Sequence, residues 1–376
     1  MTSVALAQPT VRAPAQTHRL PFVDLLRAMG SQAIVWHHLA FYGPLSDIAY
    51  PLAPLAIDLL YDYARMAVQI FFVLGGFMTA RITQRSKPLT WRATLRAVLQ
   101  RYLRIGLPYI VTLVIAMLAN SLAGRLMEHE SISAPPTLAA LGAHLLFLQS
   151  VLDHEAITAG IWYLAIDFQL FLLLLFVSVM ATTLCRSLHL ATSAFLAIKT
   201  TLWGIALASL FYINRNANLD DYALYFFGAY FGGVLVAWRN AKKLNRWELP
   251  LYLLATALAV GIEFRPRLLV AAATTCVLWF TSRTKLLERW PQGSLSSYLG
   301  RTSYSLFLIH FPVCLVVNAV VSSYNVGPEG ALLGMVTAWA MSMAAAHVFY
   351  RFVETPSLGL RLPSRPPQPL RIRPEI

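Results

Sequence analysis

The feature that most constrains the fold is a series of apolar runs, each close to the length that crosses a lipid bilayer. A spanning helix needs about 20 predominantly apolar residues. Hydrophobic residues make up 57% of the chain and charged residues only 12%, about half the charged share of a soluble domain. The sequence therefore predicts an all-α, polytopic membrane helical bundle with about ten transmembrane helices. The predicted spans are 22–42, 66–82, 103–120, 161–182, 187–211, 222–238, 249–263, 267–282, 303–321 and 331–350.

The distribution of lysine and arginine predicts how these spans are oriented. If residues 138–152 do not cross, the segments on one side carry 23 of the 30 Lys and Arg, and those on the other side carry five. Cytoplasmic loops hold this excess, so both termini are expected in the cytoplasm. The run 138–152 is short and interrupted by His144. A crossing there would turn the later basic loops outward, so none is expected, and a re-entrant path stays open.

One membrane domain is expected, without an appended soluble domain. Residues 1–20 are predicted to form a flexible cytoplasmic tail, residues 21–355 the ten-span domain, and residues 356–376 a basic cytoplasmic tail. The net charge is +13, but the basic residues cluster in short loops, so the lipid bilayer and not nucleic acid is the expected partner. Three cysteines argue against a disulfide framework, and no ligand spacing predicts a metal site.

The first span carries charged and titratable residues on one face. Arg27 and His38 are 11 residues apart, which is about 20° past three helical turns and about 16 Å along the axis. Asp24 lies three residues before Arg27, where the two can pair, while His37 points about 100° away. Such residues usually face a bundle interior or a wet cavity, although snorkelling to the interfaces is the alternative. A histidine there is suited to take a proton from a hydroxyl.

The segment 81–104 is the most basic part of the chain. Arg101 and Arg104 share one helical face where the next span begins. Two guanidinium groups at a cytoplasmic mouth suit a phosphorylated ligand. The alternative is that basic residues here only fix topology, and this applies most to Arg81, Arg85, Lys87, Arg92 and Arg96.

The run that begins at 161 places Asp167 and Gln169 inside the bilayer. A carboxylate at that depth needs a histidine or arginine from another span, a substrate hydroxyl, or a structural hydrogen bond between helices. Trp162 and Tyr163 are expected at the outer interface, where aromatic side chains concentrate.

Three further motifs hold polar residues or glycines. His310 precedes a proline in a late span, and either a buried hydrogen bond or a site role fits it. Glu354 at the end of the last span is expected to pair with Arg351 at i−3. Gly75 and Gly76 permit close helix approach. A structural role is favoured for the glutamate and the glycines.

Taken in order, these motifs resemble the acyltransferase-3 family of integral membrane acyltransferases along about 20–357. The matching elements are Arg27 to His38 in "LRAMGSQAIVWHH", "FFVLGGF" at 71–77, Arg101 and Arg104 before Pro108, "WYLAIDFQLFL" from Trp162, "SYSLFLIHFP" at 303–312, and Glu354 with Pro356.

The resemblance implies an enzyme of the plasma or inner membrane that transfers an acyl group, most often acetyl. The donor would be cytoplasmic acyl-CoA, with no bound cofactor, and the acceptor a hydroxyl of a cell-surface glycan, glycolipid or small molecule. Arg27, Arg101 and Arg104 would bind the donor. His38 would be the general base or carry the acyl group, and Asp167 would orient the histidine or the acceptor.

Three departures from the family pattern affect what the resemblance implies. Gly75 replaces the usual serine, Asp167 the usual glutamate, and Gln69 an aspartate. They leave acyl transfer as the expected activity but weaken the inference of any particular acceptor. The alternatives are a transporter or channel with polar residues lining a permeation path, and a non-catalytic protein that binds or flips a lipid-linked glycan. A transporter would predict an inverted repeat, and none is visible.

Overall fold

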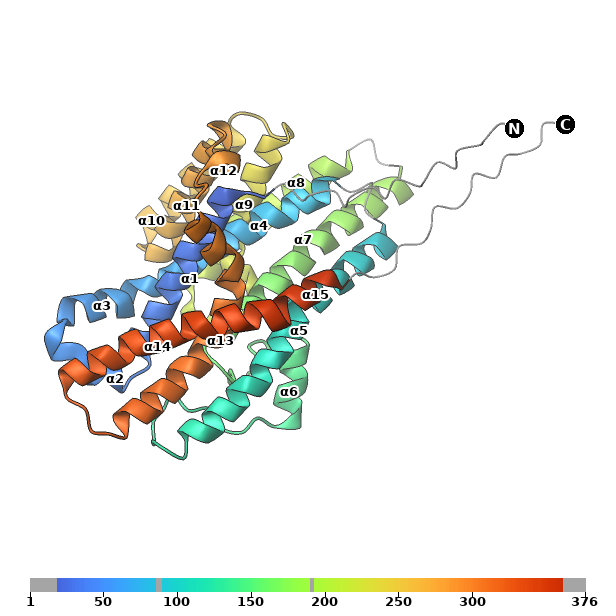
Figure 1. The fold of residues 1–376 in the computed structure, drawn as a ribbon. Helices are drawn as coiled ribbons and strands as arrows, with labels where there is room; N and C mark the ends of the chain where they lie inside the picture. Colours follow the sequence, from blue (N-terminus) through green and yellow to red (C-terminus); the bar gives the residue numbers. More distant parts are fainter. Residues whose placement is uncertain (1–18, 86–89, 190–192, 361–376) are drawn as a thin grey trace, which may run out of the picture.

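The computed structural model describes residues 19–85, 90–189 and 193–360, and within these ranges the chain is helical and contains no strand (Figure 1). Each predicted span overlaps a helix, although several of the bounds differ. These helices are α1 (Pro21–Phe41), α4 (Val68–Arg85), α5 (Trp91–Ala123), α7 (Ile161–Ser187), α8 (Ala194–Phe211), α9 (Ala223–Asn240), α10 (Glu248–Ile262), α11 (Pro266–Arg283), α13 (Ser294–Ser322) and α14 (Pro328–Phe349).

Six helical stretches of the described chain are long and apolar enough to cross a membrane. The all-helical prediction is therefore confirmed, and the fold is that of a membrane protein. The number of about ten spans and the cytoplasmic orientation of both ends remain predictions. The six stretches are Pro54–Gln84, Trp91–Ala123, Ile161–Ser187, Ala194–Arg215, Ser294–Ser322 and Pro328–Gly359.

Short elements connect the long helices. The run 138–152 contains only α6 (Leu138–Leu145), which is about 12 Å long and too short to cross a bilayer. The predicted C-terminal tail begins inside a helix, because α15 (Thr355–Gly359) continues from the last span. The other short elements are α2 (Leu45–Ala49), η1 (Tyr50–Leu52), α3 (Pro54–Tyr63), η2 (Ala64–Ala67), η3 (Ile213–Arg215), η4 (Ala217–Leu219), α12 (Leu286–Arg289) and the π-turn η5 (Tyr350–Glu354).

Close packing of α4 against α9 forms the centre of the bundle. A Cβ at Gly76 would collide with the carbonyl oxygen of Tyr230, and one at Gly233 would collide with that of Val73. Only glycine permits this approach of two backbones. The predicted role of Gly76 is thereby confirmed.

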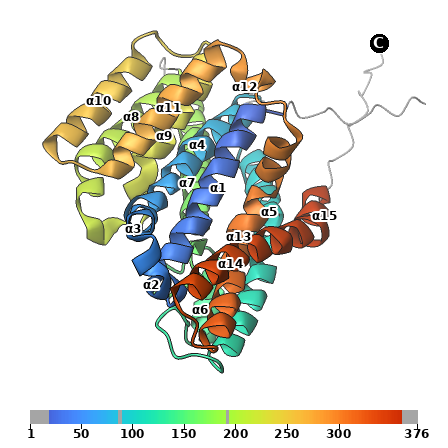
Figure 2. The ribbon, with the colours of Figure 1, turned by 60° about the vertical axis from the view of Figure 1, so that its left-hand side comes forward.

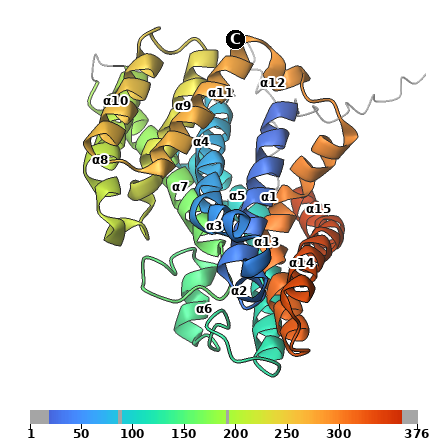
Figure 3. The ribbon, with the colours of Figure 1, turned by 90° about the vertical axis from the view of Figure 1, so that its left-hand side faces the viewer.

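Helices α1 and α13 run side by side in the same direction. Near their first residues Arg19 donates to the carbonyl oxygen of Ser297 at 3.1 Å, and near their last residues Asn318 donates to that of Tyr42 at 3.1 Å. Figures 2 and 3 show α1 and α4 between α8 and α10 on one side and α13 and α14 on the other. Aromatic contacts join α4 to α7 and α7 to α13, and Phe71 of α4 packs against Gly30 of α1, so side chains from these four helices meet inside the bundle.

Candidate active site

A pair of histidines joins α1 to α13. His38 Nδ1 lies 2.7 Å from His310 Nε2, and the rings are nearly parallel, with an interplanar angle of 17°. Both side chains are buried. The other ring nitrogen of His310, Nδ1, lies 2.9 Å from the carbonyl oxygen of Leu306. The contact with His38 assigns His310 to the candidate site.

These two contacts determine where the protons of the neutral rings lie. A carbonyl oxygen only accepts hydrogen bonds, so the proton of His310 must be on Nδ1, and its Nε2 is the acceptor. His38 must then donate from Nδ1. Its Nε2 is left with a lone pair, which is the form of the ring that takes a proton from a hydroxyl.

The neighbouring His37 points elsewhere. Its Nδ1 donates to the carbonyl oxygen of Leu60 in α3 at 3.0 Å. The two adjacent histidines thus contact different helices, as the 100° helical step requires. Only His38 joins the pair with His310.

The beginning of α7 lies directly against the His38 ring. Gly160 precedes the helix with φ +83°, and a Cβ there would lie 3.4 Å from His38 Cε1 and from the Phe307 ring. The first N–H groups of a helix lack intrahelical partners, and this end carries partial positive charge. Sequence reasoning missed Gly160, although a glycine just before a long apolar run is a signal for a helix start.

A buried ion pair links α5 to α7. Arg101 Nη2 lies 2.5 Å from Asp167 Oδ2, and the guanidinium lies 4.5 Å from the centre of the Phe171 ring. Of the expected partners of Asp167, the structure therefore shows an arginine. The expectation that Asp167 orients His38 is not supported by the geometry, because the carboxylate bonds to Arg101 and the imidazole bonds to His310.

Gly75 lies beside the free oxygen of this carboxylate. Asp167 Oδ1 is buried without a hydrogen-bond partner among the described residues. A Cβ at Gly75 would lie 2.5 Å from it. The glycine at this position leaves the room that the carboxylate occupies, so Gly75 belongs to the candidate site and not only to helix packing.

Arg27 and Arg104 form a second cationic group near this ion pair. Arg104 is within electrostatic reach of Arg27 and of Glu354. Neither guanidinium makes a hydrogen bond or ion pair with any residue in the described ranges. The predicted pair of Arg27 with Asp24 is wrong, because Asp24 accepts a 2.7 Å bond from Arg19 instead. Both arginines can therefore bind an anion.

Glu354 is buried and accepts a 2.5 Å hydrogen bond from the hydroxyl of Ser305 in α13. The predicted pair with Arg351 is wrong, since Arg351 is exposed and lies over the Phe352 ring. The bond to Ser305 ties the end of the last long helix to α13. It also holds a carboxylate within electrostatic reach of Arg104.

Three aromatic side chains lie between the arginines and the histidine pair. The Tyr163 ring centre is 5.6 Å from that of Phe71 and 5.4 Å from that of Phe307. Tyr163 is also within electrostatic reach of Arg27 and Asp167. We call Phe71, Tyr163 and Phe307 the aromatic cluster.

The remaining predicted residues are structural or lie outside the site. Gln169 donates to the carbonyl oxygen of Phe147 at 2.8 Å, and Trp162 packs against Phe226. Of the basic residues in 81–104, Arg92 and Arg96 are exposed. Arg81 lines a cavity described below, and the Arg85 side chain and Lys87 lie outside the described residues.

The segment that leads into Gly160 is held by His144. Its Nε2 accepts a 3.2 Å hydrogen bond from the backbone N–H of Ile157. Burial, with a smaller contribution from His154, lowers the pKa of His144 from 6.5 to about 4. The unfolded chain therefore takes up a proton below pH 6.5 that the folded chain does not bind until about pH 4.

The free energy of unfolding should consequently decrease through protonation of His144 as the pH falls from about 6.5 to about 4. The melting temperature of purified protein should fall more steeply over this range than that of His144→Gln, whose side chain does not titrate. Parallel curves for the two proteins would contradict this role of His144.

Comparison with known proteins identifies the family. A family model described as "Acyltransferase domain" matches residues 20–351, nearly the whole chain, including both members of the histidine pair. The chain belongs to the acyltransferase-3 family. No curated protein and no solved structure matches it. Membership in the acyltransferase-3 family, together with the long apolar helices, makes the chain a membrane acyltransferase.

Proposed function

We propose that this acyltransferase is an O-acyltransferase of the plasma or inner membrane. It moves an acyl group, acetyl in the simplest case, from cytoplasmic acyl-CoA to a hydroxyl of a cell-envelope glycan, glycolipid or related small molecule. The observation that carries the proposal is the 2.7 Å contact between His38 Nδ1 and His310 Nε2. It leaves His38 Nε2 as a base inside a protein whose family transfers acyl groups.

The arginines supply the donor end of the proposed site. Arg27 and Arg104 have no anionic partner bonded to them within the described ranges, and guanidinium groups bind phosphate well. Arg101 is different, because its charge is already balanced by Asp167 at 2.5 Å. We therefore assign phosphate contact to Arg27 and Arg104, and to Arg101 the positioning of this end of α5.

The proposed donor end of the site lies some distance along α1 from the reacting histidine. Arg27 and His38 are about 16 Å apart along α1, and the aromatic cluster lies between them. The flexible arm of acyl-CoA would extend past this cluster so that the thioester meets His38. Phe71 packs against Gly30 of α1, which lies between Arg27 and His38 in the helix, and this contact supports the proposed path.

The proposed reaction balances without a metal or redox partner. His38 Nε2 takes the proton of the acceptor hydroxyl, and the hydroxyl oxygen attacks the thioester carbon. The tetrahedral intermediate then collapses, the C–S bond breaks, and the CoA thiolate takes the proton from His38. His310 accepts the Nδ1–H bond throughout, as the carboxylate does in a serine-protease triad. We assign the oxyanion donors to the first N–H groups of α7, because Gly160 lies against the His38 ring.

A covalent route uses the same atoms in a different order. His38 Nε2 attacks the thioester carbon first, the C–S bond breaks, and CoA is expelled as the thiolate, which leaves an acyl-imidazolium. The acceptor hydroxyl oxygen then attacks the acyl carbon, the C–N bond to His38 breaks, and the hydroxyl proton passes to the CoA thiolate. Both routes release one CoA thiol for each acyl group transferred.

The test is thiol release by the purified protein in lipid nanodiscs, supplied with acetyl-CoA and host envelope glycans. We expect release that depends on the glycan, with a matching gain of acyl mass on it. Movement of a glycan or solute across the membrane without thiol release would support the transporter or flippase alternative and overturn the proposal.

A further inference from the structure

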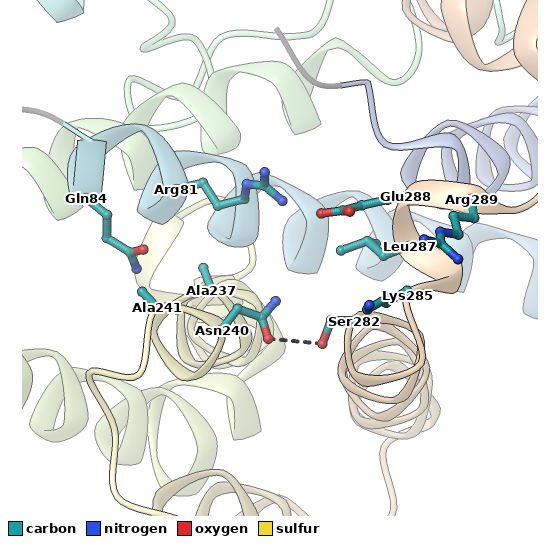
Figure 4. Close-up of a pocket in the computed structure, with 10 residues that line it drawn as sticks. All are labelled: Arg81, Gln84, Ala237, Asn240, Ala241, Ser282, Lys285, Leu287, Glu288 and Arg289. Carbon is teal, nitrogen blue, oxygen red and sulfur yellow. Dashed lines mark hydrogen bonds between the residues drawn. The ribbon is translucent and has the colours of Figure 1, made fainter.

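A cavity of about 550 Å³ opens where α4, α9 and α11 end, beside α12. Figure 4 shows side chains from all four elements around it. The Ser282 hydroxyl donates to Asn240 Oδ1 at 3.0 Å across one wall. The charged residues that line this cavity are Arg81, Lys285, Glu288 and Arg289.

A second cavity of about 290 Å³ shares Asn240 with the first. Its charged lining consists of Arg239, Lys242 and Arg283. The two linings together hold six basic residues and one acidic residue. This composition favours an anionic ligand.

Three of these cations have no partner in the part of the chain that the structure describes. The side chains of Lys242, Lys285 and Arg289 make no hydrogen bond, ion pair or ring contact there. By contrast, Arg239 donates to the carbonyl oxygen of Leu244, and Arg283 lies over the Trp279 ring. The unpartnered cations are distributed over both cavities.

The backbone at the two lysines is unusual for this residue type. Lys242 has φ +56° and Lys285 has φ +63°. This left-handed region favours glycine and asparagine, and other side chains enter it at a steric cost. Positive charges near a helix C-terminus are favourable in general, but that effect does not require a lysine at the strained position itself. Each cavity lining thus holds one lysine at a left-handed position just after a helix end.

We propose that these adjacent cavities bind the phosphate-bearing headgroup of an anionic membrane lipid. The cavities lie at the ends of α4, α9 and α11, which are predicted to span the membrane, on the side predicted to be cytoplasmic. Large apolar side chains close in sequence to the lining residues are exposed, including Phe280 at 62%, Trp247 at 58% and Trp290 at 51%. Tryptophans at this level and basic pockets between helices are features of lipid-headgroup sites.

The phosphates of CoA share the same chemistry, so the test must separate the two sources. Detergent-purified protein is titrated with short-chain phosphatidylglycerol, short-chain phosphatidylcholine and CoA, and bound ligand is counted by native mass spectrometry. We expect phosphatidylglycerol to bind more tightly than phosphatidylcholine and to stay bound when CoA is added.

The variant Lys285→Asn with Arg289→Gln should weaken phosphatidylglycerol binding at least about tenfold. Asparagine tolerates the left-handed backbone, so the fold should be kept, which an unchanged melting temperature confirms. Arg92→Gln with Arg186→Gln removes the same charge from outside the cavities and should leave binding unchanged. Equal binding by the two double variants would overturn the proposal, as would displacement of the lipid by CoA. The assay requires no turnover, so its outcome is independent of the proposed reaction.

Discussion

Replacing His38 with alanine should lower acyl transfer by about 10²- to 10⁴-fold, the usual contribution of a positioned general base. His37→Ala should keep most of the wild-type rate, because His37 bonds to the carbonyl oxygen of Leu60 and not to His310. Thiol release from acetyl-CoA at saturating acceptor measures both variants.

The two substitutions are well matched. Both remove a buried imidazole from the same turn of α1, and each breaks one hydrogen bond. A common structural defect would therefore lower both rates and both melting temperatures. Equal activity in the two variants would contradict the separate roles assigned to these histidines.

The second large effect is expected at the ion pair of α5 and α7. Arg101→Met leaves the Asp167 carboxylate buried without a partner, and breaking a buried pair in this way costs about 3–5 kcal/mol. Removing both charges, as in Arg101→Met with Asp167→Leu, should recover most of that stability. Thermal unfolding in a single detergent measures the stability of the wild type and of both variants.

Activity distinguishes a structural pair from a site residue. If Arg101 positions the donor end, the double variant should regain stability but not the wild-type rate of acyl transfer. Recovery of both would show that the pair serves stability alone. An Arg101→Met variant as stable as the wild type would contradict the claim that an unpaired, buried Asp167 carboxylate lowers stability.

Hydropathy located the helices well but not their ends. The first span was predicted at 22–42 and α1 is Pro21–Phe41. In contrast, the span predicted at 303–321 belongs to a helix that starts at Ser294. An apolar run covers only the part of a helix that can lie in the hydrocarbon core of a membrane. The helix itself extends into polar sequence as far as its capping residue. The helix predicted from 103 begins after the Thr90 cap, whose hydroxyl accepts the N–H of Ala93.

Within the site, the helical period separated His38 from His37 without any structure. It could not predict that His38 contacts His310, which is 272 residues away in sequence, since such contacts depend on how helices pack. The local pairs predicted for Asp24 and Glu354 failed for the same reason. A pair at i, i+3 on a helix contributes only a few tenths of a kcal/mol, so Arg19 and Ser305 replaced the expected partners.

The most direct test of the account is the acyl transfer rate of two variants at His310. His310→Gln offers an amide oxygen that can accept the His38 Nδ1–H bond, whereas His310→Ala leaves that N–H without a partner. We predict a loss of at least about tenfold for the alanine variant, as expected when a catalytic imidazole loses its orienting acceptor, and a rate for the glutamine variant between those of alanine and wild type. A wild-type rate in His310→Ala would contradict the claim that this histidine sets the proton on His38.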